Sequence, residues 1–152
     1  MKLIKINGMR KNILSIVITM MCFSGIAQNY NKGVLVEIVQ KTDTTSIGQK
    51  FVLPDLKNME VTMAKVTIQP GKSTGWHKHN FAVFAYVAKG NLTVNFENGK
   101  TLQFTENSSI AEVVNTYHNG TNNGTEDAVL YVYYLGEKGK PLSIRKEQAV
   151  GN

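Results

Sequence analysis

Residues 71–90 read GKSTGWHKHNFAVFAYVAKG, and the two histidines in this stretch are the strongest clue to the fold. His77 and His79 are two positions apart, so on a β-strand both imidazoles point to the same face. A neutral imidazole is the commonest metal ligand in proteins. An isolated His-x-His pair is equally typical of surface or core histidines that hydrogen bonds satisfy, so the pair needs support from the rest of the chain.

A third histidine lies in the segment VVNTYHNGTN, residues 113–122, where His118 comes just before a turn. Asn98-Gly99 lies between the two histidine segments and separates two runs of alternating residues, which is the strongest short-range signal for a β-hairpin. His118 therefore follows the first pair by about one hairpin. If the three rings meet in space, they would form most of a metal coordination sphere.

The rest of the sequence is typical of short β-strands separated by turns, and no stretch shows a convincing helical period. Residues 128–135 form a continuous apolar run, for which we expect burial on both faces of a sheet. Further strands are expected within residues 34–40, 61–68, 81–88, 92–96, 102–104 and 110–114. Many short, closely spaced strands predict an all-β sandwich or barrel in a single domain.

The two histidine segments resemble the two sequence motifs of the cupin superfamily. Residues 71–79 together with YVAKG at 86–90 are similar to the first motif, and residues 113–122 are similar to the second. The resemblance covers roughly residues 34–135. It implies a single-domain cupin-type β-barrel, that is, a jelly-roll-like double-stranded β-helix. Cupins carry out many chemistries and some only bind ligands, so the resemblance does not by itself name an activity.

Three positions depart from the cupin motifs. Cupins commonly place a glutamate ligand where this chain has Val83, and Val113 and Asn115 stand where a proline and a glycine are expected. The resemblance therefore implies the three-histidine variant of the site. In this variant the metal ligands are His77, His79 and His118. Three imidazoles suit several divalent transition metals, which leaves iron, zinc, nickel, manganese and copper open.

Two other side chains are candidates for catalysis. Glu112 shares strand parity with Ile110, and the cupin pattern points that face into the barrel. There the carboxylate could be an extra metal ligand, a partner of a ligand or a general base. A shift of one residue in the register would instead expose Glu112 to solvent. Tyr117 is the second candidate for proton transfer.

Apolar residues near the histidines are expected to shape a pocket. Trp76, Phe81 and Val83 are the candidates for its lining, with plain core packing as the alternative. Phe81, Val83, Ala85 and Val87 share parity with the histidine pair, so we predict that they face the interior of the barrel.

Two functions fit these residues. What three-histidine cupins do suggests a metal-dependent oxygenase that acts on a small organic molecule. The alternative is a non-catalytic periplasmic protein that binds a small ligand or a metal, and the scarcity of inward acid–base groups favours it. We also expect a homodimer, because outward aromatic residues such as Phe84 and Tyr86 could form a contact between two sheet faces.

The first 27 residues differ from the rest of the chain. A basic patch at residues 9–12 precedes an apolar run at 13–23, and small residues lead up to Ala27, as in a cleaved signal peptide. The apolar run is short for a membrane span, which needs roughly 20 residues, so we expect no stable membrane anchor. We expect residues 1–27 to be removed, residues 28–152 to form the cupin domain, and the mature protein to be periplasmic or secreted.

Removal of the signal would also change the charge of the protein. The full chain has 17 basic and 11 acidic residues, a net charge of +6. Four of the basic residues lie within residues 1–27, so the mature chain would carry +2. The basic character is therefore mostly a property of the signal, and we expect a small-molecule ligand and no nucleic-acid partner. Cys22, the single cysteine, also lies in this segment, so the mature chain can form no disulfide.

Overall fold

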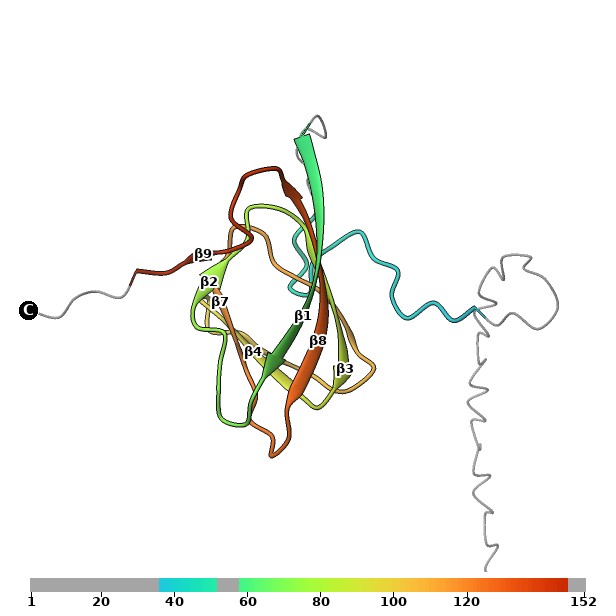
Figure 1. The fold of residues 1–152 in the computed structure, drawn as a ribbon, viewed down its shortest axis with the longest axis vertical. Helices are drawn as coiled ribbons and strands as arrows, with labels where there is room; N and C mark the ends of the chain where they lie inside the picture. The colour runs from blue at the N-terminus through green and yellow to red at the C-terminus, as the bar shows by residue number, and fades with distance from the viewer. Residues whose placement is uncertain (1–35, 52–57, 148–152) are drawn as a thin grey trace, which may run out of the picture. The chain divides into compact units, whose positions relative to one another are not determined.

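A computed structural model describes residues 36–51 and 58–147 of the chain (Figure 1). The expected signal peptide, residues 1–27, lies outside the described residues. Backbone contacts divide the chain into residues 1–37 and residues 38–152, and the description below concerns the second unit. No helix within the described residues is long and apolar enough to cross a membrane.

Nine β-strands form two antiparallel sheets within the described residues. The four-stranded sheet has the order β1 (Met59–Ile68), β8 (Ala128–Glu137), β3 (Val83–Lys89) and β6 (Ser109–Ala111). The five-stranded sheet has the order β5 (Thr101–Phe104), β4 (Leu92–Phe96), β7 (His118–Thr121), β2 (His77–Lys78) and β9 (Ile144–Arg145). The two sheets face each other in Figure 1, which confirms the all-β, jelly-roll-like architecture expected from the sequence.

The core between the sheets follows from strict alternation along the strands. In β4, Leu92, Val94 and Phe96 are buried while the residues between them are partly exposed. In β3, Val83, Ala85 and Val87 are buried on the same face, and Phe81 precedes them in the same core. The prediction that these four residues face the interior is therefore confirmed. Each large apolar side chain buried in this way contributes about 1.5–3 kcal/mol to the free energy of unfolding.

The hairpin predicted at Asn98-Gly99 is present between β4 and β5. Gly99 has a φ of 84°, a left-handed conformation that glycine adopts without steric cost. The Asn98 side chain accepts a hydrogen bond from the Lys100 amide at 3.0 Å, which closes the turn. Leu92 then pairs with Phe104, so the turn sets the register of both strands.

Two expectations about strands are wrong. β8 is not buried on both faces, because Tyr131 and Tyr133 point outward and are 41% and 42% exposed. Tyrosine counts as apolar in the sequence pattern, but its ring can lie on an exposed face of the sheet. Residues 36–40, the described part of the apolar run at 34–40, form no strand; Val39 instead accepts a hydrogen bond from the Ser109 hydroxyl through its carbonyl.

Asn122 ties the loop after β7 to the end of β1. Its side chain is fully buried and donates hydrogen bonds to the carbonyls of Ile68 and Glu126, both at 2.7 Å. Its side-chain oxygen accepts a hydrogen bond from the Gly124 amide at 2.9 Å. Because every polar atom of this amide is used, the group stabilises a turn that joins the two sheets.

We predict that Asn122→Ala lowers the free energy of unfolding by about 2–4 kcal/mol, because the buried carbonyl of Ile68 and the partly buried carbonyl of Glu126 lose their donor. The matched control is Asn123→Ala, since the neighbouring Asn123 is exposed and its amide contacts the Thr93 hydroxyl at 3.1 Å. The control should lose less than about 1 kcal/mol. Urea unfolding followed by circular dichroism measures both, and equal losses would argue against a structural role for Asn122.

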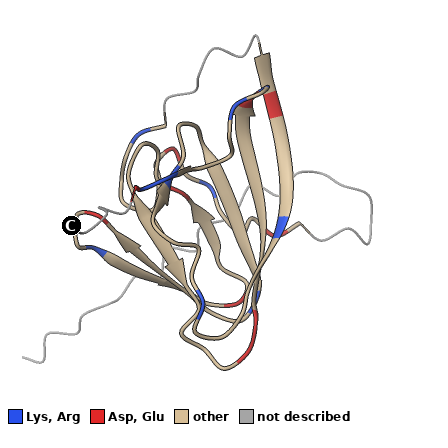
Figure 2. Ribbon diagram, turned by 60° about the vertical axis from the view of Figure 1, so that its left-hand side comes forward, with Lys and Arg blue, Asp and Glu red and all other residues tan. Residues whose placement is uncertain are grey.

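The outer face of the four-stranded sheet is unusually apolar. Met63 on β1 is 64% exposed and lies opposite Tyr133 of β8, and Val61 is 56% exposed on the same strand. Phe84 and Tyr86, the aromatics expected at a dimer contact, lie further across this face: the Phe84 ring packs against Phe51, and the Tyr86 hydroxyl donates to Asn107. Charged residues of both signs are scattered over strands and loops in Figure 2.

The homodimer stays a prediction, and this face is where it can be tested. An apolar edge strand such as β1 invites pairing with a second copy. We therefore expect Met63→Lys to raise the dissociation constant of the dimer at least tenfold, since it would place an unpaired charge in the contact. Lys100→Glu, in the β4–β5 hairpin, is the control. Size-exclusion chromatography with light scattering would contradict the prediction if the unmodified protein is a monomer.

Candidate metal centre

Strand pairing brings the three histidines together. β2 lies antiparallel to β7 with His77 directly opposite His118, and His79 follows two residues later beside Val114. The ring centroids of His77 and His118 are 4.4 Å apart. The His79 centroid lies 5.0 Å from that of His77 and 5.2 Å from that of His118. One ligand nitrogen from each ring lies within 4.8 Å of the other two. The meeting of these rings, which the sequence predicted, is confirmed.

Each imidazole is oriented by a hydrogen bond from its other nitrogen. The Nδ1 atoms of His77, His79 and His118 lie 2.8, 2.7 and 3.0 Å from the carbonyl oxygens of Gly75, Leu142 and Thr116. A carbonyl oxygen can only accept, so each Nδ1 carries the proton and donates it. In a neutral ring the Nε2 lone pair is then left for a common centre, which is the arrangement that metal-binding histidines use. A ring that takes up a second proton instead donates it from Nε2, and Glu112 lies within reach of His79 and His118.

Two loop residues have the backbone conformation that this arrangement needs. Gly75, whose carbonyl orients His77, has a φ of 74°, and a Cβ at this position would lie 2.9 Å from a guanidinium nitrogen of Arg145. The left-handed conformation disfavours any residue other than glycine, and a Cβ would also require the Arg145 guanidinium to move. Asn115 stands where a cupin glycine is expected and has a φ of 54°, a region that asparagine tolerates better than most residues. Its amide donates to the His79 carbonyl at 2.7 Å.

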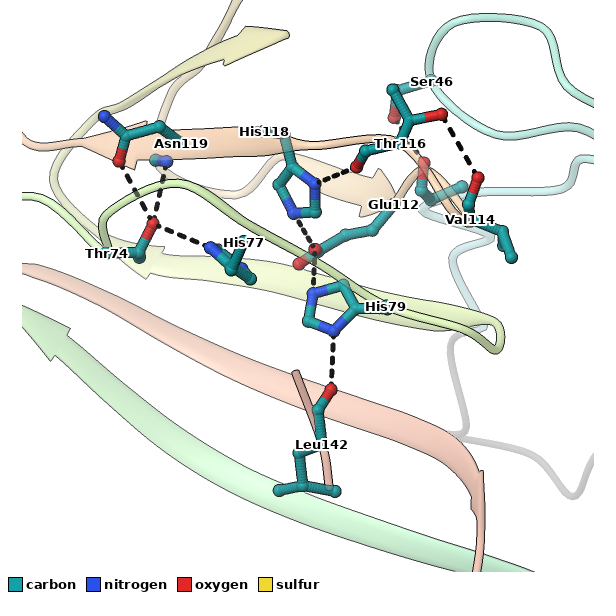
Figure 3. Close-up of polar contacts among 12 residues, drawn as sticks. Ser46, Thr74, His77, His79, Glu112, Val114, Thr116, His118, Asn119 and Leu142 are labelled. Atoms are coloured by element: carbon teal, nitrogen blue, oxygen red, sulfur yellow. Dashed lines mark hydrogen bonds and ion pairs between the residues drawn. The ribbon is translucent and has the colours of Figure 1, made fainter. Parts of the chain in front are cut away.

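Glu112 points toward the histidines. Its Oε2 atom lies 3.2 Å from the Nε2 atoms of both His79 and His118, and its side chain is 17% exposed (Figure 3). The Glu112 amide donates to the Val83 carbonyl at 2.9 Å, so Glu112, the residue just after β6, lies beside Val83 of β3. A carboxylate from the end of β6 thus reaches the histidines next to Val83, the position where the cupin motif carries its glutamate.

The electrostatics of this group favour a bound cation. Burial raises the pKa of Glu112, but hydrogen bonds from His118 and His79 outweigh it and hold the pKa of this carboxyl well below its usual range. Burial also lowers the pKa of His118, whereas the Glu112 carboxylate raises it, with a net increase. Burial lowers the pKa of His77 to about 4, so this ring is neutral at pH 7. Two Nε2 lone pairs and a carboxylate oxygen repel one another unless a proton or a metal ion lies among them.

The histidine cluster faces a cavity of about 70 Å³ between the two sheets. Most of the cavity wall is apolar and comes from both sheets: Val66, Ile68, Leu92, Val94, Phe96, Ile110, Val113, Leu130 and Val132. Its polar lining consists of Ser46, Thr74, Tyr134, Glu112 and the three histidines. A small molecule in this cavity would contact apolar side chains over most of its surface and the histidines at one end.

The remaining predicted site residues lie away from this cavity. Trp76 is 39% exposed, and Lys146 places its ammonium 5.8 Å from the Trp76 ring and 5.2 Å from the Tyr117 ring. Phe81 and Val83 are buried in the core; the Phe81 ring centroid lies 6.4 Å from that of His79. The structure therefore brings Glu112 to the three histidines, and it places Tyr117 on the outer side of the same sheet.

Sequence reasoning missed two contributors to the site. Tyr134 lines the cavity, and its parity with Leu130 and Val132 on β8 could have indicated this. The carbonyl of Leu142, which orients His79, had no detectable signal because any residue supplies a backbone carbonyl.

The fold and the site together define a two-sheet β-barrel protein with a buried three-histidine cluster. Residues 64–134 match the sequence profile of the cupin domain. No curated protein matches the chain at a significant level. The sequence match and the fold agree that residues 64–134 form a cupin domain.

Solved structures with a similar fold include enzymes. A chain from the crystal structures of the DMSP lyases RdDddP and RnDddQII is 19% identical, with a TM-score of 0.50 over 57% of this chain and 44% of that chain. The oxalate decarboxylase of Lactobacillus farciminis in a formate complex is 21% identical, with a TM-score of 0.50 over 56% of this chain and 26% of its own. This chain therefore matches less than half of either relative, and the likeness concerns the fold.

A C-terminal strap, residues 138–147, completes the metal centre although it lies outside the matched residues 64–134. It contains β9, which pairs with His77 and Lys78, and the Leu142 carbonyl that orients His79. Arg145 also donates to the Thr74 carbonyl at 3.1 Å.

Removal of the strap should weaken metal binding by about 10–100-fold, because His79 loses the group that holds its ring and β2 loses a neighbouring strand. The test is a chain that ends at Lys138, titrated with Zn²⁺ against a chromophoric chelator. A chain that ends at Glu147, which keeps the strap, is the control. Equal affinities in two folded proteins would show that the Leu142 carbonyl does not matter.

Proposed function

We propose that this protein holds one divalent transition metal on His77, His79 and His118, with Glu112 as an additional ligand or as a direct partner of the metal-bound histidines. The observation that carries the proposal is the set of Nδ1–carbonyl bonds, which fix all three rings with their Nε2 atoms turned to one centre. Histidines that only pack in a core need not all carry the proton on Nδ1, and their Nε2 atoms need not point to one common centre.

The ligand atoms fit a metal ion that is intermediate between hard and soft. Imidazole nitrogen with one carboxylate oxygen suits iron, zinc, nickel, manganese and copper. Because three neutral histidines leave the charge of the ion undiminished, a bound metal would supply a strong Lewis acid or a centre that binds oxygen. Glu112, with its pKa held low by the histidines, is ionised at neutral pH and would offset part of that charge.

A metal-dependent oxygenase acting on a small organic molecule is the enzymatic form of the proposal. The apolar cavity beside the cluster supports it, because such a wall would exclude bulk water and hold a small organic substrate against the metal. The similarity in fold to a lyase and a decarboxylase is compatible with an enzyme, though neither is an oxygenase by name. If the signal-like segment is cleaved, the activity would lie in the periplasm or outside the cell.

A non-catalytic binding protein is the second candidate, and one observation favours it. Glu112 is the single carboxylate that lines the cavity among the described residues, and its Oε2 atom is already engaged by His79 and His118. A carboxylate tied in this way is a poor general base. The protein would then capture a metal or a small ligand without turnover.

Metal content tests the proposal directly. We expect close to one transition metal per chain in protein purified without a polyhistidine tag. The double variant His77→Ala/His118→Ala should retain less than about a tenth of it, because one imidazole cannot hold the ion at comparable affinity. Lys78→Ala is the matched control, since Lys78 lies between His77 and His79 in the chain and contacts the Tyr117 ring from the outer side.

Inductively coupled plasma mass spectrometry gives the metal per chain, and circular dichroism shows whether each variant folds. A folded, unmodified protein that takes up no transition metal when incubated with each candidate ion would overturn the proposal. Oxygen uptake with a panel of phenols and thiols then separates the two candidates. Turnover that the double variant lacks supports the oxygenase, and a metal-loaded protein without turnover on any panel member supports the binding protein.

A further inference from the structure

Tyr134 lies at the edge of the metal centre, on the strand opposite the histidines. It belongs to β8, where it lies on the same face as the buried residues Leu130 and Val132 and pairs with Thr62 and Val83 on the neighbouring strands. Its ring stands edge-on to the His79 imidazole, with centroids 5.7 Å apart and an interplanar angle of 66°. Tyr134, which carries a hydroxyl, therefore lines a cavity that is otherwise mostly apolar.

The other polar groups of the cavity are already committed. The Ser46 hydroxyl donates to the Ala111 carbonyl at 2.8 Å. The Thr74 hydroxyl accepts from the Gly120 amide at 3.0 Å and has carbonyl oxygens of Gly75 and Asn119 as acceptors. Within residues 36–51 and 58–147, the Tyr134 hydroxyl has no hydrogen-bond partner. Among these residues it is thus the one uncommitted donor that lines the cavity.

The Tyr134 hydroxyl is available as a donor. The ordinary pKa of a tyrosine hydroxyl is about 10, so the group carries its proton at neutral pH. No lysine or arginine lines the cavity among the described residues, so an oxygen atom of a ligand has no other side-chain cation or free donor to approach. A phenol that keeps its proton in an apolar site is a strong donor toward such an oxygen.

The size of the cavity limits the ligand. A volume of about 70 Å³ admits on the order of five water-sized positions, or a molecule with a similar number of non-hydrogen atoms. The apolar part of the cavity wall is made of valine, leucine, isoleucine and phenylalanine side chains, which favour a hydrocarbon body.

We propose that the Tyr134 hydroxyl determines the specificity of this site by donating a hydrogen bond to an oxygen atom of a small ligand whose body is a short apolar chain. This inference rests on the proposed metal function, because the metal would bind the same polar end of the ligand. Tyr134 would select ligands with an oxygen acceptor over ligands of the same shape that lack one.

The test uses the full chain loaded with Co²⁺, whose visible absorption changes when a ligand enters its coordination sphere. Two probes share a propyl-sized body: propionate, which has oxygen acceptors, and 1-propanethiol, which has none. The variants are Tyr134→Phe, which removes only the hydroxyl, and Tyr133→Phe, which makes the same change on the outer face of the strand.

We expect Tyr134→Phe to weaken propionate binding by about 10–100-fold, as for a lost hydrogen bond to a charged acceptor. The same variant should change 1-propanethiol binding by less than about threefold, and Tyr133→Phe should change neither. Cobalt content per chain should be equal in all three proteins, since Tyr134 is not a ligand.

Each failure has its own meaning. Unmodified protein that binds no Co²⁺ or other transition metal overturns the proposed function and this inference together. Normal cobalt content with unchanged propionate affinity in Tyr134→Phe overturns the inference alone. Equal weakening of both probes would show that Tyr134 only shapes the cavity, and a loaded protein whose spectrum does not respond to propionate would show that the ligand class is wrong.

Discussion

The pairing of β2 with β7 is the constraint on which the site depends. It places His77 opposite His118, and the chain then needs only two more residues to bring in His79. β2 is two residues long, so the pair cannot hold itself in register. β7 on one side and β9 on the other hold it, while carbonyls of Gly75, Thr116 and Leu142 fix the rings. Without these neighbours the three imidazoles would sample many rotamers, and ordering them would oppose metal binding.

Glu112 supplies a carboxylate near the place where the glutamate of the cupin motif would project from position 83, but it does so from the neighbouring segment of the sheet. Residues directly opposite each other on antiparallel strands point to the same face, so the neighbour of Val83 across the sheet reaches the space that a side chain at position 83 would reach. The carboxylate then occupies a mostly buried place where an isolated negative charge would be costly. The hydrogen bonds from His79 and His118 offset that cost, which is why the carboxylate and the histidines form one electrostatic unit.

Alternate residues of β8 line the two faces of its sheet, and the two faces have different roles. Leu130, Val132 and Tyr134 face the cavity, while Tyr131 and Tyr133 are exposed on the outer face next to Met63. The inner face shapes a small apolar space beside the histidines, and the outer face is available for contact with another molecule. Tyrosine suits both positions because its ring packs against apolar neighbours while its hydroxyl remains able to bond.

The histidines, the core parity of β3 and the Asn98-Gly99 hairpin were predictable from the sequence, because two-residue periodicity and turn chemistry are local properties of the chain. The sequence could not decide whether Glu112 points inward, since one residue of register reverses every side chain and register depends on pairing with a distant strand. Tyr117 and Trp76 were nominated for their nearness in sequence to the histidines, but alternation sends them to the outer side of the sheet, where they contact Lys146. The Leu142 carbonyl that orients His79 could be found only in the tertiary structure, because a backbone group has no identity in the sequence and acquires its role when β9 folds back onto β2.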